Sequence, residues 1–157
     1  MGHAVVVFHA GDLGTRQAAE EIARGLAGAG RNDVVVTRPR GLSAARLEAA
    51  GIVVLGVPGS ARAAREEFDE LAVAVRSGGL QRKTVSIFEV GTAGHCGPGA
   101  RRLRASLEAD DPGLRLAAPG ISVSSFGGRS ELSEPEAARC RRFGEHLAGL
   151  ALAEGRG

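Results

Sequence analysis

The sequence predicts an α/β protein built on a doubly wound parallel sheet, and three observations lead to this fold class. Short runs rich in β-branched residues alternate with segments whose apolar residues recur at helical spacing. The runs lack the polar alternation of a half-exposed strand, which indicates strands covered on both faces. Glycine or proline marks most of the joins. Right-handed crossovers between such strands predict a five-stranded sheet of order 2-1-3-4-5 with helices on both faces.

Each expected strand and helix has a local pattern behind it. The first helix carries Ala18, Ile22 and Leu26 at the three-to-four spacing of one helix face. In the last helix Pro135 lies between two glutamates, which is typical of a helix start. The expected strands are residues 4–8, 33–37, 52–56, 84–88 and a run within 114–123. The expected helices are residues 15–29, 43–49, 62–77, 100–109 and 134–152, with a polar loop at 124–133.

Length and composition favour a single domain. The chain has 157 residues, which is close to one domain, and 43% of them are hydrophobic, enough to build a core. No internal repeat or linker divides it. We therefore expect one domain at residues 1–153, followed by a frayed tail at residues 154–157.

Charge and residue usage exclude several classes of protein. No apolar run approaches the length of a membrane helix, and no basic segment typical of a signal peptide precedes the first apolar run. Two cysteines make no disulfide framework, so we expect a cytoplasmic protein. The net charge is only +2, and the five phenylalanines are the only aromatic residues besides histidine. A nucleic-acid role is not expected, because single-stranded sites usually need aromatic stacking platforms.

The residues that follow the expected strands exclude three doubly wound families. A response-regulator receiver needs acidic residues after the first strand, where this chain has His9 and Ala10. A dinucleotide-binding domain needs a Gly-x-Gly-x-x-Gly loop and an acid ending the second strand, whereas that strand ends here at Thr37. No Gly-Lys-Ser/Thr of a Walker loop follows the first strand.

Four segments carry a positive resemblance. Residues 15–26 read TRQAAEEIARGL, residues 54–58 read VLGVP, residues 80–88 read LQRKTVSIF, and residues 134–144 form the start of the last helix. In order and spacing they resemble the first helix, the third strand, the approach to the fourth strand and the terminal helix of flavodoxins. The resemblance covers nearly the whole chain and is strongest to the flavodoxin-like domains of flavodiiron proteins. It implies that the chain binds FMN.

The resemblance places the FMN phosphate in the loop after the first strand. There, hydroxyls and backbone N–H groups at a helix N-terminus would bind a dianion. Thr15 matches the family, whereas Ala10 and Asp12 replace hydroxyl residues. Asp12 would repel a phosphate unless Arg16 compensates, and it is equally well placed to cap the helix. The cofactor-binding residues implied by this loop are Ala10, Gly11, Asp12, Leu13, Gly14 and Thr15.

The resemblance places the flavin ring between the next two loops. After the third strand, Pro58, Gly59 and Ser60 would contact the ring, although Ser60 is also suited to cap a helix. After the fourth strand, a glycine-rich loop runs from residue 91 to 99. In it Gly91 and Thr92 would offer backbone donors, and His95 would stack on the ring or remain a solvated loop residue.

The same loop leaves a thiol enzyme open as an alternative. Cys96 follows His95 and precedes a helix, and a cysteine in such a place can have a lowered pKa. Cys140 lies in the middle of the last helix and is expected in the core. The four histidines show no metal-binding spacing, so no metal is expected.

Arginines are expected near the ligand edge of the sheet, at positions 62, 65, 101, 102 and 104. An electron carrier with such a surface would meet a redox partner whose surface is acidic or mixed. The leading hypothesis is therefore an FMN-binding electron carrier or small flavoprotein without its own acid–base machinery. The alternatives are a cofactor-free binding or regulatory module of the same fold, and a thiol enzyme using Cys96.

Overall fold

The computed structural model describes most of the chain. The residues described are 2–9, 13–31, 33–58, 69, 73, 79–92, 97–111, 114, 116, 120–126 and 131–155. Of the helix expected at residues 62–77, only Asp69 and Val73 are described, and both are helical. The rest of that helix lies outside the described residues.

The described strands form one sheet of order β2-β1-β3-β4-β5-β6. The first five strands in this order are parallel, and this confirms the predicted order 2-1-3-4-5. The strands are β1 (His3–Phe8), β2 (Asp33–Thr37), β3 (Ala50–Pro58), β4 (Thr84–Thr92), β5 (Ile121–Phe126) and β6 (Glu131–Leu132). The helices are α1 (Leu13–Gly28), η1 (Pro39–Gly41), α2 (Ala44–Ala49), α4 (Pro98–Asp110) and α5 (Glu134–Ala153).

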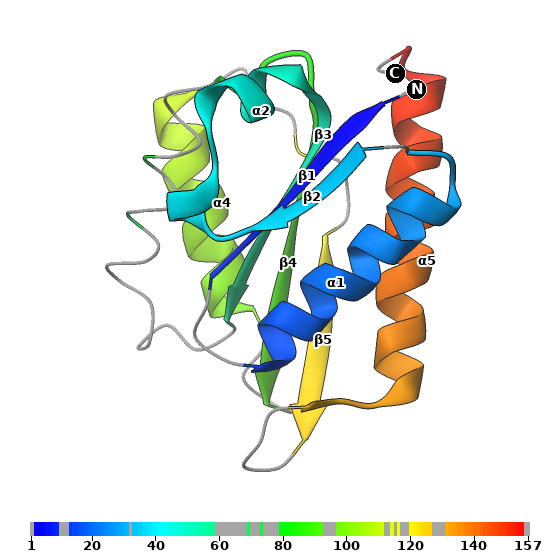
Figure 1. The fold of residues 1–157 in the computed structure, drawn as a ribbon. Helices are drawn as coiled ribbons and strands as arrows, with labels where there is room; N and C mark the ends of the chain where they lie inside the picture. The colour runs from blue at the N-terminus through cyan, green and yellow to red at the C-terminus, as the bar shows by residue number, and fades with distance from the viewer. Residues whose placement is uncertain are drawn as a thin grey trace.

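Helices cover both faces of the sheet, with α1 and α5 side by side on one face and α2 and α4 on the other (Figure 1). Alternate residues of β1 show why both faces must be covered. Ala4 and Val6 pack into the core under α1 and α5. Val5 and Val7 pack into a second core with Leu47 of α2 and with residues of α4. From Ala4 to Phe8, β1 is apolar throughout because neither of its faces meets water.

The last part of the sheet differs from the prediction. The fifth strand was expected within residues 114–123, but β5 begins at Ile121 and continues to Phe126. In the earlier part of that range, Leu116 makes only an isolated bridge to Val85. The expected loop at 124–133 instead contains the end of β5 and the short strand β6, which pairs antiparallel with β5.

Side chains of α5 meet the backbone along the outer edge of β5. The Ser124 N–H donates to a carboxyl oxygen of Glu136 at 2.9 Å, and the Arg139 guanidinium donates to the Ser122 carbonyl at 3.3 Å. Burial raises the pKa of Glu136, but the hydrogen bonds from Ser124 and Arg139 outweigh it, so the pKa lies below its ordinary value. The start of α5 is thereby tied to the edge of the sheet.

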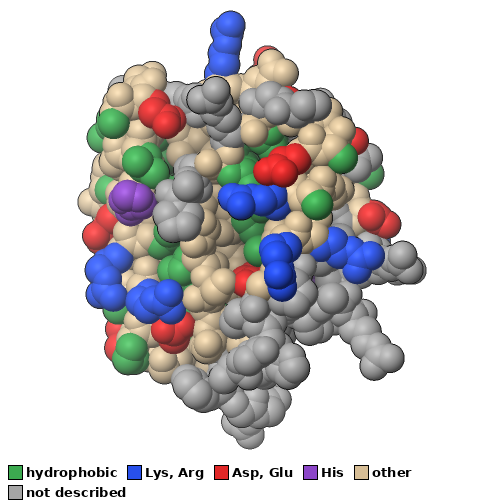
Figure 2. Space-filling view, turned by 180° about the vertical axis from the view of Figure 1, so that it is seen from behind, with side chains coloured by type: hydrophobic (Ala, Val, Ile, Leu, Met, Phe, Trp, Pro, Cys, Tyr) green, Lys and Arg blue, Asp and Glu red, His purple; other side chains and the backbone are tan. Residues whose placement is uncertain are grey.

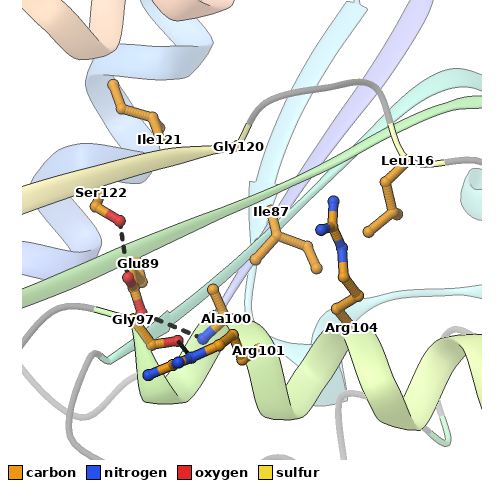
Figure 3. A pocket seen from close by; sticks show the side chains of 10 residues that line it. All are labelled: Ile87, Glu89, Gly97, Ala100, Arg101, Arg104, Leu116, Gly120, Ile121 and Ser122. Atoms are coloured by element: carbon orange, nitrogen blue, oxygen red, sulfur yellow. Dashed lines mark hydrogen bonds between the residues drawn. The ribbon is translucent and has the colours of Figure 1, made fainter.

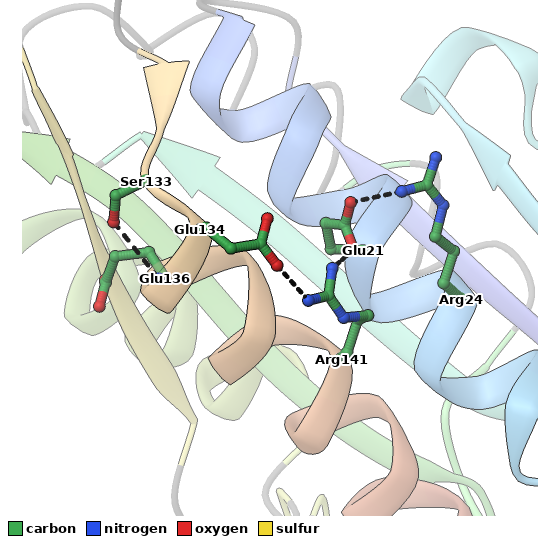
Figure 4. Close-up of polar contacts among 6 residues, drawn as sticks. All are labelled: Glu21, Arg24, Ser133, Glu134, Glu136 and Arg141. Atoms are coloured by element: carbon green, nitrogen blue, oxygen red, sulfur yellow. Dashed lines mark hydrogen bonds and ion pairs between the residues drawn. The ribbon is translucent and has the colours of Figure 1, made fainter.

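The backbones of α1 and α5 touch at two glycines. A Cβ atom on Gly25 would lie 2.0 Å from the carbonyl oxygen of Arg141, and one on Gly144 would lie 2.2 Å from that of Ile22. Only residues without a side chain permit this approach. Beside the crossing, the Arg141 guanidinium donates to Glu21 and to Glu134, each at 2.6 Å (Figure 4). Arg24 donates to the same Glu21, so one network spans both helices.

Cys140 lies in the core under α1 and α5, as predicted, with no exposed surface. Burial raises the pKa of its thiol from 9.0 to about 12, and the nearby Glu136 adds to the increase. The unfolded chain ionises this thiol near the ordinary pKa, whereas the folded protein keeps the proton. The unfolded state therefore loses its proton first, and stability falls as the pH rises from about 9 toward 12.

This linkage gives a measurable pH dependence. Between about pH 8 and about pH 10 the wild type should lose about 1.4 kcal/mol more unfolding free energy than Cys140→Ala, which has no thiol at this position to ionise. Urea unfolding of both proteins at the two pH values measures the difference. Equal losses in the two proteins would contradict the assignment of the raised pKa to Cys140.

Candidate functional site

The carboxyl ends of β1, β3 and β4 lie next to one another at one edge of the sheet. Phe8 pairs with Gly56, and Pro58 pairs with Val90 two residues further along β3. The His9 N–H, just beyond β1, donates to the Gly56 carbonyl at 2.9 Å. In a doubly wound sheet, ligands bind outside the strand ends where neighbouring crossovers diverge, which here is between β1 and β3.

Helix α1 begins at this edge, at Leu13, two residues earlier in the chain than the helix expected from residue 15. Leu13, Gly14 and Thr15 were assigned to the loop, but the structure places them in the first turn. This turn contains no acidic residue. Gly14 and Thr15 are buried, whereas Leu13 keeps 44% of its surface exposed. The N–H groups of a first turn lack acceptors inside the helix and carry partial positive charge, so this end of α1 suits an anion.

The residues expected against a flavin ring lie at the ends of β3 and β4. Pro58 is the last residue of β3, and Gly91 and Thr92 are the last residues of β4. Gly91 and Thr92 also pair with β5, opposite Ser124 and Ser125. The expected loop therefore begins two residues later than predicted, because β4 continues through Thr92.

Gly56 shows why the end of β3 cannot carry a larger residue. A Cβ atom at this position would lie 2.1 Å from the ring of Phe88, which is buried on the neighbouring strand. The ring of Phe88 fills the space beside Gly56 and closes the core beneath the candidate site.

Glu89 is a site residue whose role sequence reasoning missed. Its side chain is buried, with 1% of its surface exposed, near the carboxyl end of β4. One carboxyl oxygen accepts from the Ala100 N–H at 3.2 Å, and the other from the Ser122 hydroxyl at 2.7 Å (Figure 3). Gly97, the residue that caps α4, offers no side chain to this helix start and has φ 126°, a conformation that favours glycine. Glu89 thus replaces the missing cap and joins β4, α4 and β5.

A groove opens beside Glu89, between α4 and β5. It has a volume of about 350 Å³, and Ile87 and Leu116 contribute apolar surface to it. Arg101 and Arg104 of α4 line its other side (Figure 3). Of the five arginines expected near this edge, Arg101 and Arg104 line the groove, whereas Arg62 and Arg65 lie outside the described residues.

Several predicted residues fall outside the part of the chain that the structure describes. They are Ala10, Gly11, Asp12, Gly59, Ser60, His95 and Cys96. Their roles remain predictions. Among the described residues, no group of three or more His, Cys, Asp or Glu side chains is arranged to hold a metal ion. A search of the same residues for helices with the length and hydropathy of a bilayer span found none.

Comparison with known proteins identifies the fold. The chain is similar to a flavodoxin from the domain Archaea, with a TM-score of 0.81 and 16% identity over 96% of this chain and 99% of that one. For the oxidised flavodoxin 1 of Bacillus cereus, the TM-score is 0.70 and the sequence identity is 18%, over 94% of this chain and 97% of that one. For the flavodiiron core of Flv1 from Synechocystis, the TM-score is 0.75 and the sequence identity is 15%, over 96% of this chain and 36% of that one. No family model and no curated protein matches the sequence. The chain therefore has the flavodoxin-like fold.

Proposed function

We propose that this flavodoxin-like chain binds FMN at the carboxyl edge of its sheet and acts as an electron carrier or small flavoprotein. The observation that carries the proposal is the start of α1. Its first turn is free of acidic residues and follows β1, whose end is bonded to β3. The solved structures of similar fold are flavodoxins, which supports the choice of ligand.

The described residues fit different parts of FMN. The first-turn N–H groups of α1, from Leu13 onward, would hold the phosphate. The ends of β3 and β4, at Pro58, Gly91 and Thr92, would flank the ring. Bound FMN supplies the capacity to take up one or two electrons, and the protein's part is to bind and orient it.

The substitution Leu13→Glu separates binding from folding. A glutamate in the first turn of α1 interacts favourably with the helix dipole, so stability should stay the same or rise slightly. The same charge would repel a phosphate dianion, so the affinity for FMN should fall about tenfold. Quenching of FMN fluorescence during titration with protein measures the affinity, and thermal unfolding measures the stability.

Two controls test whether the loss of FMN affinity comes from repulsion of the phosphate at the start of α1. Riboflavin lacks the phosphate, so Leu13→Glu should change its binding by less than about twofold. Leu152→Glu adds the same charge at a position that is 64% exposed near the end of α5, and it should leave FMN binding unchanged. Absence of FMN binding to the wild-type protein at micromolar concentration would reject the proposal.

One observation favours a cofactor-free binding or regulatory module as the second candidate. Thr15, which matches the family in the first loop, has no exposed surface. A hydroxyl with no exposed surface offers no donor to a phosphate that approaches from solvent. The same titration separates the two candidates, because a cofactor-free module gives no quenching.

A further inference from the structure

We propose that the N-terminal half of α4, together with the groove beside it, is a docking site for an acidic surface on a partner protein. The basic α4 surface is defined here as Arg101, Arg102 and Arg104. The inference rests on the proposed function in one respect: an electron carrier needs a partner that docks near its cofactor. The surface itself is argued from charge, pairing and position.

The charges of α4 oppose the helix dipole. The three arginines lie in its first two turns, where the partial positive charge of a helix makes cations unfavourable. Its acidic residues, Glu108 and Asp110, lie near the C-terminus of the helix, where the partial charge is negative. The first turn contains no acidic residue, and the last turn contains no basic residue. Helix stability does not explain this order. This order of charges concentrates positive potential at the N-terminal end of α4.

The pairing of these arginines is weaker than that of Arg139 and Arg141 on α5. Arg141 lies 2.6 Å from Glu21, and Arg139 lies 2.9 Å from Glu136. In contrast, Arg104 lies 3.8 Å from Glu108, and Arg101 donates to the Gly97 carbonyl rather than to an acid. Arg102 has no ion pair with any residue in the described ranges of the chain. The side chains of the basic α4 surface are exposed, and within the described part of the chain much of their charge has no close acidic partner.

The basic α4 surface lies beside the candidate cofactor site. Residues 93–96 alone separate Thr92, at the end of β4, from Gly97, which caps α4. Figure 2 shows Lys and Arg side chains gathered in the middle of the face seen from behind, around a hollow with hydrophobic side chains in it. The groove between α4 and β5 provides such a hollow, lined by Ile87 and Leu116 as well as by arginine. Apolar surface ringed by charge is typical of a protein interface.

The chemistry of the groove favours an acidic protein over a nucleic acid. No aromatic side chain is among the described residues that line it, so unstacked bases would find no platform. The exposed Glu108, beside Arg104, also interrupts the positive charge of this surface, which suits discrete carboxylates better than a continuous phosphate backbone.

Binding of a short, fluorescein-labelled poly-L-glutamate to the full chain tests the proposal by anisotropy at low ionic strength. The double variant Arg102→Gln/Arg104→Gln removes two charges of the basic α4 surface and should weaken binding about tenfold. The matched control Arg24→Gln/Arg142→Gln removes two exposed charges of α1 and α5 and should change binding by less than about twofold. Thermal unfolding verifies that all three proteins are folded.

The remaining outcomes overturn the proposal. Equal weakening in both double variants would mean that only net charge matters, and no binding to the wild type would mean that there is no acidic docking site. Tighter, α4-dependent binding of a single-stranded oligonucleotide of equal charge would assign the surface to nucleic acid. Because this experiment needs no flavin, its failure is distinct from a failure of FMN to bind in the titration above.

Discussion

Replacing Gly144 by alanine is expected to destabilise the protein by about 3 kcal/mol, because α1 and α5 cannot then keep their contact. The added methyl group would lie 2.2 Å from the Ile22 carbonyl oxygen and 2.9 Å from the Leu26 nitrogen. Both are backbone atoms in the middle of a helix, so neither moves without displacing α1. A loss of this size corresponds to a fall of about 10 °C in Tm for a chain of this length.

The same helix supplies the control for this prediction. Gly149 also lies within α5, but no atom is within 4 Å of a Cβ built on it. Gly149→Ala should therefore stabilise the protein by about 0.5 kcal/mol, since alanine has the higher helix propensity. Chemical unfolding of both variants measures the two effects. Similar stabilities for Gly144→Ala and Gly149→Ala would show that the helices do not approach as closely as described.

Replacing Glu89 by alanine is expected to cost about 3 kcal/mol, since it removes a buried side chain and leaves two partly buried hydrogen-bond donors without acceptors. The Ala100 N–H loses its acceptor at the start of α4, and the Ser122 hydroxyl loses its acceptor on β4. Glu89→Gln keeps one acceptor oxygen but turns an NH₂ group toward a donor, so about half of that loss is expected.

Amide exchange gives this second prediction a local readout. In Glu89→Ala the Ala100 amide should exchange faster relative to the centre of α4, because the first turn of the helix is no longer held. Glu108→Ala is the control on the same helix, since Glu108 is 53% exposed and 3.8 Å from Arg104. It should change stability by less than about 0.5 kcal/mol. Unchanged stability and unchanged exchange in Glu89→Ala would refute the capping role.

The elements that the sequence predicted well are those whose signal lies within a few consecutive residues. The strand expected at residues 33–37 has the observed bounds of β2. The helix expected at residues 43–49 is observed as α2, and the Ser43 hydroxyl caps it by accepting from the Arg46 N–H at 3.2 Å. In both cases the signal is local, because a short apolar run or one capping residue suffices.

The fifth strand was misplaced because its environment differs from that of the others. In β5 the serines at 122 and 124 alternate with Ile121 and Val123, so the strand is apolar on one face only. Such alternation marks a half-covered strand near the edge of a sheet, whereas the prediction sought a run apolar throughout. Leu114 and Leu116 offered that pattern nearby, and they pack against the core without forming a strand.

The candidate site was predictable in position but not in its supporting contacts. Strand ends follow from the order of elements, so the sequence places Pro58, Gly91 and Thr92 at one edge. Glu89 could not be recognised in this way. Its partners Ala100 and Ser122 lie 11 and 33 residues further along the chain, and only the folded arrangement brings them together.

The contacts along β5 have a consequence for how this protein behaves at high concentration. An outer strand with free N–H and C=O groups is a template for another chain, and intermolecular sheet growth starts at such edges. Here Glu136 occupies the Ser124 N–H, Arg139 occupies the Ser122 carbonyl, and β6 pairs with the last two residues of the strand. The side chains that anchor α5 thus also keep these backbone groups from pairing with another chain.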